Sequence, residues 1–218
     1  MKVDVRLNAI LDPERANGRL LADLAREVVA GGATLIQLRD KHGATRQMIE
    51  QARAIKAALA GSGVPLVVND RVDVALVAGA DGVHVGQEDM RAEDARCLLG
   101  PQAIIGLSIK SVALAQAAPL DVLDYVGVGG VYATTSKDNP SPTLGVNGLR
   151  GIVAAFRARR RDLPICGIAG IDAGNAAPVI AAGADGVAVI SALSMRDDPR
   201  AAARELRAVI DAALRAPA

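Results

Sequence analysis

The fold is decided by one stretch in the first half of the chain, residues 64–90, which reads VPLVVNDRVDVALVAGADGVHVGQEDM. Residues 66–68 form an apolar run that is too short for a helix, as in a parallel strand buried on both faces. A short helix over 73–80 and a second strand over 82–85 follow. Each strand leads into a polar turn with a carboxylate, Asp70 in the first turn and Asp89 in the second.

These two carboxylates predict a metal site. Consecutive parallel strands deliver their carboxyl ends to the same edge of a sheet, and neighbouring strands lie roughly 4.8 Å apart. Asp70 and Asp89 are therefore placed to share one hard cation such as Mg²⁺, which prefers oxygen ligands.

The same alternation of strand and helix continues along the whole chain. Strict alternation predicts a parallel sheet, and eight such units in 218 residues predict one (β/α)8 barrel, the TIM-barrel fold of the α/β class, over residues 1–218. An open, doubly wound sheet is the alternative. The predicted strands cover residues 3–10, 34–38, 66–68, 82–85, 103–107, 125–128, 165–168 and 186–190.

An internal repeat supports the barrel. The sequence AGADGV at 78–83 recurs unchanged at 182–187, four βα units later, which is half of a barrel. We expect its glycines to end helices at the bottom of the barrel and to be structural. Thr45 and Asp172 are the predicted N-cap residues of two helices.

Composition excludes several classes of function. Hydrophobic residues make up 51% of the chain, aromatic residues only 1%, and the net charge is +1. No basic tract or aromatic platform predicts nucleic-acid binding, and no apolar run reaches the ~18 residues of a membrane span. The first residues do not resemble a signal peptide. Cys97 and Cys166 lack metal-ligand spacing, so we expect two buried thiols in a cytoplasmic protein, which in this fold often forms homo-oligomers.

The strand over 34–38 ends in the sequence QLRDK. Its period of two directs Gln37 and Arg39 into the barrel, with Lys41 just above them. An arginine in the interior is costly unless it meets an anion, so Arg39 predicts an anionic ligand or, as the alternative, an internal ion pair. Asp40 should point the other way and is a weak candidate for the partner of Arg39.

Other strand ends supply hydroxyl groups and a further cation. Ser108 follows the strand over 103–107. The long segment 129–146 carries Thr134, Thr135, Ser136 and Lys137, and we interpret it as an anion-binding lid rather than a plain connection.

A separate phosphate subsite is predicted after the last two strands. Gly170 lets backbone N–H groups approach a phosphate, and Ile190 and Ser191 lie in a loop that commonly binds phosphate in this fold. His84 lies within a strand, where we expect it to pack rather than to catalyse.

This inventory favours one type of chemistry. It holds three cations, a carboxylate pair and a second phosphate subsite, but no nucleophile with a paired base. A reaction that stabilises a diphosphate leaving group fits best, and the second subsite would hold a phosphorylated acceptor.

With these residues assembled, the chain resembles the thiamine-phosphate synthase family. The resemblance implies a (β/α)8 transferase that joins hydroxymethylpyrimidine diphosphate to a thiazole phosphate or its carboxylated form. The products would be thiamine phosphate and pyrophosphate, formed by a dissociative, Mg²⁺-assisted reaction. The matching blocks run in order over almost the entire length: QLRDK (37–41), VNDRVDVALVAGADGVHVGQED (68–89), IGLS (105–108), DYVGVGGVYATTSK (124–137), CGIAGI (166–171) and GADGVAVISA (183–192).

The resemblance also implies roles for individual residues. The pyrimidine diphosphate would be held by the 37–41 block, Asn69, Ser108 and Lys137, and Mg²⁺ by Asp70 and Asp89. The thiazole phosphate would contact the segment 134–136 and the phosphate subsite. The implied binding residues are Gln37, Arg39, Asp40, Lys41, Asn69, Ser108, Thr134, Thr135, Ser136, Lys137, Gly170, Ile190 and Ser191, with Arg39, Lys41, Ser108 and Lys137 also serving catalysis.

The chain departs from the family pattern in the lid, where GGVYATTSK stands in place of a sequence closer to GPIFPTxTK. Loss of two prolines should loosen the lid. Two other functions stay open: a thiazole tautomerase on the same barrel, and a non-catalytic barrel that binds a phosphorylated ligand. Lys137 and the carboxylate pair argue against the tautomerase.

Overall fold

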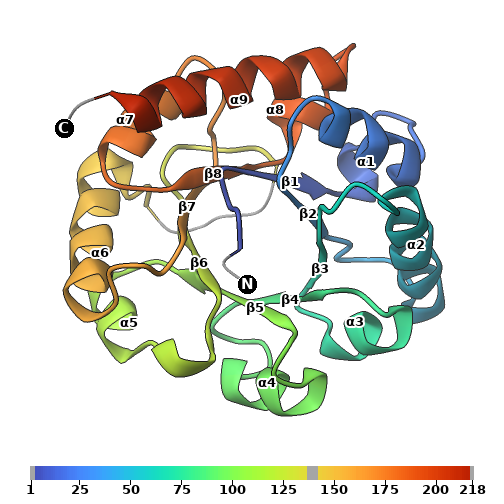
Figure 1. Ribbon diagram of the computed structural model, residues 1–218, viewed down its shortest axis with the longest axis horizontal. Helices are drawn as coiled ribbons and strands as arrows, with labels where there is room; N and C mark the ends of the chain where they lie inside the picture. The colour runs from blue at the N-terminus through green and yellow to red at the C-terminus, as the bar shows by residue number, and fades with distance from the viewer. Residues whose placement is uncertain (1–2, 137–141, 217–218) are drawn as a thin grey trace.

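The computed structural model describes residues 3–136 and 142–216, and its strands form a closed parallel barrel in sequential order (Figure 1). Closure confirms the predicted barrel and excludes the open sheet. The strands are β1 (Leu7–Leu11), β2 (Leu35–Leu38), β3 (Leu66–Asn69), β4 (Gly82–Val85), β5 (Ile104–Ile109), β6 (Tyr125–Gly129), β7 (Ile165–Ile168) and β8 (Gly186–Val189).

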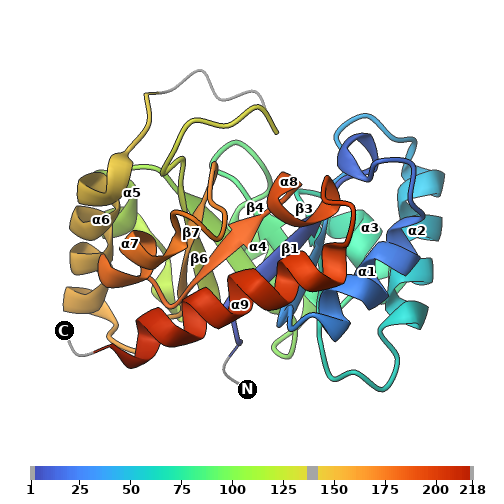
Figure 2. The same ribbon diagram turned by 90° about the horizontal axis from the view of Figure 1, so that it is seen from above.

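Helices surround this barrel, and the longest of them, α9, runs along its outside beside α1 and α7 (Figures 1 and 2). Among the described residues, no helix has both the length and the apolar character needed to cross a membrane. The α-helices are α1 (Leu21–Ala30), α2 (Thr45–Ala58), α3 (Val72–Ala78), α4 (Ala92–Leu99), α5 (Val112–Ala117), α6 (Gly145–Arg159), α7 (Ala176–Ala181), α8 (Ser191–Ser194) and α9 (Pro199–Arg215), with 3-10 turns η1 (Pro13–Arg15) and η2 (Leu120–Val122).

The strands separate two hydrophobic cores. Side chains alternate along each strand, so one set packs against the helices and the other fills the barrel interior. The larger core lies between strands and helices. The interior core is small and includes Leu35, Val67, Tyr125 and Cys166, all fully buried.

A repeated polar contact closes the bottom of the barrel. The carboxylates that precede β4, β6 and β8 each accept the backbone N–H of the preceding strand at 2.8 Å. Each carboxylate also pairs with a cation on the helix that precedes the strand whose N–H it accepts. The pairs are Asp81 with Lys56, Asp124 with Arg96, and Asp185 with Arg157. Two of these aspartates belong to the AGADGV repeat, and Gly79 ends α3 with φ at 68°. This geometry confirms that the repeat is structural.

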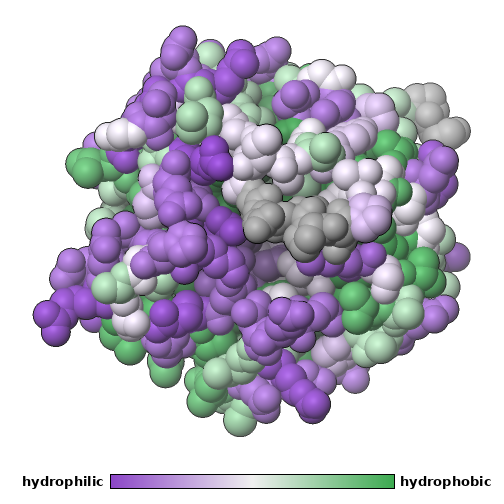
Figure 3. Space-filling view, turned by 180° about the vertical axis from the view of Figure 1, so that it is seen from behind, coloured by the Kyte–Doolittle hydropathy of each residue, from purple (hydrophilic) through white to green (hydrophobic). Residues whose placement is uncertain are grey.

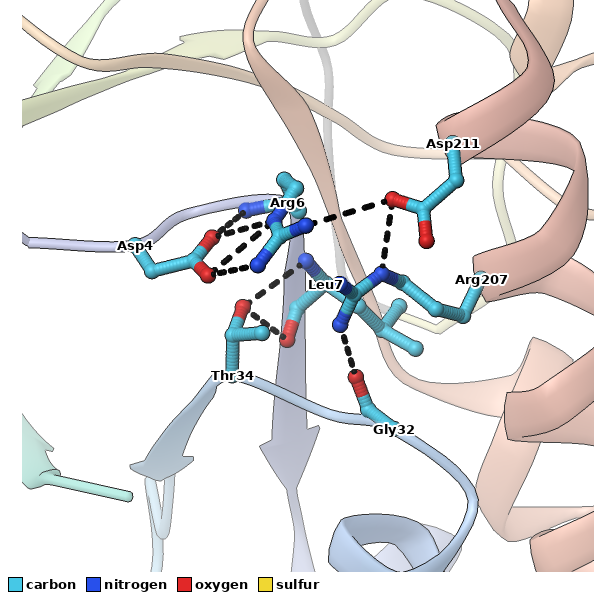
Figure 4. A network of polar contacts seen from close by, with 7 residues as sticks. All are labelled: Asp4, Arg6, Leu7, Gly32, Thr34, Arg207 and Asp211. Carbon is cyan, nitrogen blue, oxygen red and sulfur yellow. Dashed lines mark hydrogen bonds and ion pairs between the residues drawn. The ribbon is translucent and has the colours of Figure 1, made fainter. Parts of the chain in front are cut away.

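The first strand begins at Leu7, so the prediction of a strand over 3–10 was wrong for its first residues. Val3 and Val5 instead fill the bottom of the interior core. Figure 4 shows how the segment is held: Arg6 lies between Asp4, at 2.5 Å, and Asp211 of α9, at 3.5 Å. These ion pairs hold the segment, together with the backbone bond from Val187 N–H to the carbonyl of Arg6 at 3.1 Å.

Three local predictions were also wrong. Thr45 is the first residue of α2 rather than its N-cap, and its hydroxyl accepts a hydrogen bond from Arg71 at 3.0 Å. Asp172 precedes α7 by a turn, and Asn175 occupies the N-cap position. Cys166 is buried as expected, but Cys97 lies exposed on α4, because its position falls on the solvent face of that helix.

We expect Asp124→Ala to lower the free energy of unfolding by about 1–3 kcal/mol, because it leaves the N–H of Ile105 and the guanidinium of Arg96 without their carboxylate. The measurement is denaturant unfolding. Asp162→Ala is the matched control: its side chain is 71% exposed and meets Arg160 at only 3.4 Å, so the change should stay within about 0.5 kcal/mol. Equal effects of the two variants would contradict a structural role for the buried contact.

Candidate active site

A cavity of about 790 Å³ opens at the carboxyl ends of the strands. Figure 3 looks onto this face, where hydrophilic side chains gather around the centre. Its volume is in the range of small-molecule sites. Nine residues that the sequence predicted as binding residues line it together: Gln37, Arg39, Asn69, Ser108, Thr134, Thr135, Gly170, Ile190 and Ser191.

Arg39 is held by a partner that sequence reasoning missed. Its guanidinium meets the carboxylate of Asp12 at 2.5 Å, and the Asp12 side chain is only 3% exposed. The other oxygen of Asp12 accepts the N–H of Glu14 at 3.0 Å, which fixes the carboxylate at the start of η1. The internal ion pair is therefore present, and Arg39 still lines the cavity. Asp12 follows β1 directly, a position that could have revealed it.

Asp40 points away from the cavity, as period two predicted. Its Oδ1 accepts the backbone N–H groups of His42, at 3.1 Å, and Gly43, at 2.7 Å. The side chain thus stabilises the turn that follows β2, and Asp40 is not part of the cavity lining.

The carboxylates of Asp70 and Asp89 come together, as predicted, next to Asn69 of the cavity lining, and the ammonium group of Lys41 contacts Asp70. Burial raises the pKa of Asp70 above its usual value and the neighbouring Asp89 raises it further, whereas Lys41 lowers it. Asp70 has a φ of 63° and donates its backbone N–H to His84 at 2.8 Å. Asp89 accepts the N–H of Gly86 at 2.7 Å.

This pair fits a divalent cation. Two close carboxylates are stabilised by a positive ion between them, and Mg²⁺ commonly takes one or two protein carboxylates with substrate phosphates and water. Within residues 3–136 and 142–216, no group of three or more His, Cys, Asp or Glu side chains is placed to hold a metal.

A chain of polar side chains leads from the cavity into the barrel interior. Ser108 Oγ lies 2.9 Å from Nε2 of His84, and Nδ1 of the same ring lies 2.9 Å from the hydroxyl of Tyr125. Gln37 forms a hydrogen bond with that hydroxyl. His84 is 3% exposed. It packs in the interior, as predicted, but it also contacts a residue of the cavity.

The segment 130–136 covers one side of the cavity and is tied down at several points. Arg15 donates to the carbonyl of Thr135 at 2.6 Å, and the hydroxyls of Ser136 and Ser191 lie 3.0 Å apart. Gly170 has a φ of 67°, and a Cβ there would lie 2.3 Å from the carbonyl oxygen of Ala133, so only glycine allows this close approach. Lys137 lies outside the described residues.

The family model for thiamine monophosphate synthase matches residues 7–193. The chain belongs to this family. A thiamine-phosphate synthase from Agrobacterium fabrum is 51% identical over 99% of this chain and 98% of its own length. A second, from Chloroflexus aurantiacus, is 46% identical over 95% and 94%. The solved structure of a thiamine phosphate pyrophosphorylase from Pyrococcus furiosus superposes with a TM-score of 0.84 at 37% identity and covers 98% of both chains.

Family membership gives meaning to the altered lid sequence. Tyr132 stands where the family pattern has phenylalanine, and its hydroxyl donates to the carbonyl of Asn175 at 3.3 Å. A phenylalanine could not form this bond. The hydroxyl therefore offers one anchor in place of the prolines that the family has at positions 130 and 133.

We expect the pKa of Asp70 to fall in Asp89→Asn and to rise in Lys41→Met, since each change removes one neighbouring charge. Carboxyl ¹³C shifts followed against pH measure both. Because the pKa of Asp70 is raised by folding, its contribution to stability is present below the unfolded pKa and is lost as the pH rises through the raised value. Asp89→Asn should reduce that loss. A titration of Asp70 that neither variant alters would show that the charges do not interact.

Proposed function

We propose that this chain is a thiamine-phosphate synthase. It would join hydroxymethylpyrimidine diphosphate to thiazole phosphate or its carboxylated form and release pyrophosphate. Family membership over almost the whole chain supports the reaction. The observation that carries the proposal is one cavity lined by the Arg39 cation and a separate glycine–serine subsite, with Asn69 of its lining directly preceding Asp70 of the carboxylate pair.

The first step of the proposed reaction breaks the C–O bond between the pyrimidine methylene and the diphosphate, which leaves with both bonding electrons. Arg39, Lys41 and Lys137 would stabilise the negative charge that develops on the leaving group. Asp70 and Asp89 would hold Mg²⁺, which when bound neutralises diphosphate charge. Gln37, Asn69 and Ser108 would orient the pyrimidine ring.

The second step forms the C–N bond. The thiazole nitrogen donates its electron pair to the pyrimidine methylene cation, so no protein nucleophile is needed, in agreement with the residues found. The phosphate of the thiazole would be bound by Gly170, Ile190 and Ser191, and its ring would contact the segment 134–136. Exclusion of water around the bound substrates would protect the cation from hydrolysis.

Two other functions use the same barrel differently. A thiazole tautomerase has no need of a cation site for a diphosphate, and the contact between Lys41 and Asp70 beside Asp89 favours the synthase. A non-catalytic barrel would bind both substrates without turnover. A cytoplasmic location and a homo-oligomeric state belong to the same proposal, and the exchangeable thiol of the exposed Cys97 suits a reducing compartment.

We expect Mg²⁺-dependent release of pyrophosphate when the purified protein receives both substrates, and loss of release in excess EDTA. Asp70→Ala and Lys137→Ala should each lower kcat by roughly 100-fold or more, because each removes charge stabilisation from the leaving group. A coupled pyrophosphate assay measures the rate.

Lys110→Ala is the matched control for these variants. Lys110 is an exposed lysine that directly follows β5, at the same end of the barrel, and it does not line the cavity. Its rate should equal that of the unmodified chain. Folded protein that releases no pyrophosphate with either thiazole form would refute the synthase, and the tautomerase assay would come next.

We expect Asp12→Asn to raise the KM for the pyrimidine diphosphate about 10-fold with a smaller change in kcat, because Arg39 loses the carboxylate that positions it for ground-state binding. Asparagine keeps the oxygen that accepts the N–H of Glu14. Glu14→Gln removes a 63%-exposed carboxylate from the same turn and should leave both constants unchanged. An unaltered KM in Asp12→Asn would show that Arg39 needs no partner.

A further inference from the structure

The hydrogen-bonded chain behind Ser108 lies in the barrel interior, in space that glycines on β5 and β6 leave open. A Cβ on Gly106 would lie 2.3 Å from the ring of Tyr125 and 2.6 Å from Nδ1 of His84. A Cβ on Gly127 would lie 3.2 Å from the His84 ring. Both glycines leave space in the interior that the two rings occupy, so the rings can meet across β5.

The distances alone fit two directions of proton donation along this chain, because the donor and acceptor roles of the His84 nitrogens depend on its tautomer. Burial raises the pKa of Tyr125 well above its usual value, so the phenol keeps its proton, whereas a hydrogen bond donated by Gln37 lowers that pKa. With Gln37 as donor, the hydroxyl of Tyr125 has its own proton to give to Nδ1 of His84. In this arrangement a neutral imidazole would carry its proton on Nε2 and donate it to Ser108.

We propose that Tyr125 and His84 are positioning residues that leave the Ser108 hydroxyl proton free to be donated to the ligand, so that this subsite favours an aromatic ring with an acceptor nitrogen. One lone pair of the Ser108 oxygen accepts Nε2–H, and its own proton is directed to the cavity that it lines. The inference rests on the proposed function only for the identity of the ligand, a pyrimidine.

The first test reads the proton position directly and needs no substrate. The chain has two histidines, and the other, His42, has a side chain 74% exposed, so ¹⁵N-histidine spectra resolve one buried ring against a solvated reference. We expect His84 to be the Nε2–H tautomer. Ser108→Ala should keep that tautomer, because Tyr125 sets it, whereas Tyr125→Phe should give a mixture. A proton on Nδ1 of His84 in the unmodified chain would overturn the proposal.

The second test uses pyrimidine diphosphate analogues in which each ring nitrogen in turn is replaced by C–H. For one of the two positions, kcat/KM of the unmodified chain should fall roughly 10- to 100-fold, as expected when a buried donor loses its acceptor. Ser108→Ala should show no such penalty, and Tyr125→Phe should show a smaller one. Equal penalties in all three proteins would overturn the donor role of Ser108.

The two tests separate this inference from the proposed function. If the natural substrates give no turnover while His84 is the Nε2–H tautomer in a Tyr125-dependent way, then the proposed reaction fails and the directed relay stands. If turnover is normal and the tautomer is Nδ1–H, the relay fails and the synthase stands. His84→Gln adds a rescue: its amide can donate to Ser108, and it should retain more of the analogue discrimination than His84→Ala.

Discussion

Closure of eight parallel strands is the constraint on which the rest of this molecule depends. Closure sends every strand's carboxyl end to one rim and every second side chain into one narrow interior. The bottom of that interior is apolar and is completed by Val3 and Val5. Its upper part holds Gln37, His84 and Tyr125, which reach the cavity floor without leaving the barrel. The cavity floor and the interior core are therefore formed by the same set of inward-facing side chains, at different heights in the barrel.

Sequence period accounts for most of this architecture, since strand alternation determined the barrel and the inward direction of Gln37 and Arg39. It did not show which side chains meet across neighbouring strands. Asp12 directly follows β1, and the pairing of β1 with β2 brings it to Arg39. His84 was correctly placed in the interior, but its contact with Ser108 spans two strands. The predicted N-caps of α2 and α7 were wrong for local reasons: the Thr45 hydroxyl accepts from Arg71, and the Asp172 carboxylate accepts the N–H of Gly174 in the turn before α7.

The two described cations of the 37–41 block are paired in contrasting ways. Arg39 and Asp12 are largely buried, so the pair has already lost its hydration. Removal of either charge leaves the other charge unpaired in a low-dielectric environment. The Lys41 side chain is 45% exposed, so solvent screens its end of the pair with Asp70, which is 17% exposed. In the proposed reaction Lys41 would exchange Asp70 for a diphosphate oxygen, while Arg39 would keep Asp12 and add the ligand. The exposed Lys41 pair suits a residue that moves with the substrate, and the buried Arg39 pair suits a fixed binding point.

The lid shows how one constraint can replace another. Prolines limit the conformations of a loop wherever it is, whereas hydrogen bonds act only when the loop lies on its partners. Here the segment 130–136 accepts a bond from Arg15 and makes two bonds through its own residues Tyr132 and Ser136. All three partners lie outside the segment. Ser136 shares its bond with Ser191, which is also a predicted phosphate contact. A phosphate at Ser191 would compete for the same hydroxyl or share it, so binding at that subsite and the position of this segment are energetically linked through a single side chain.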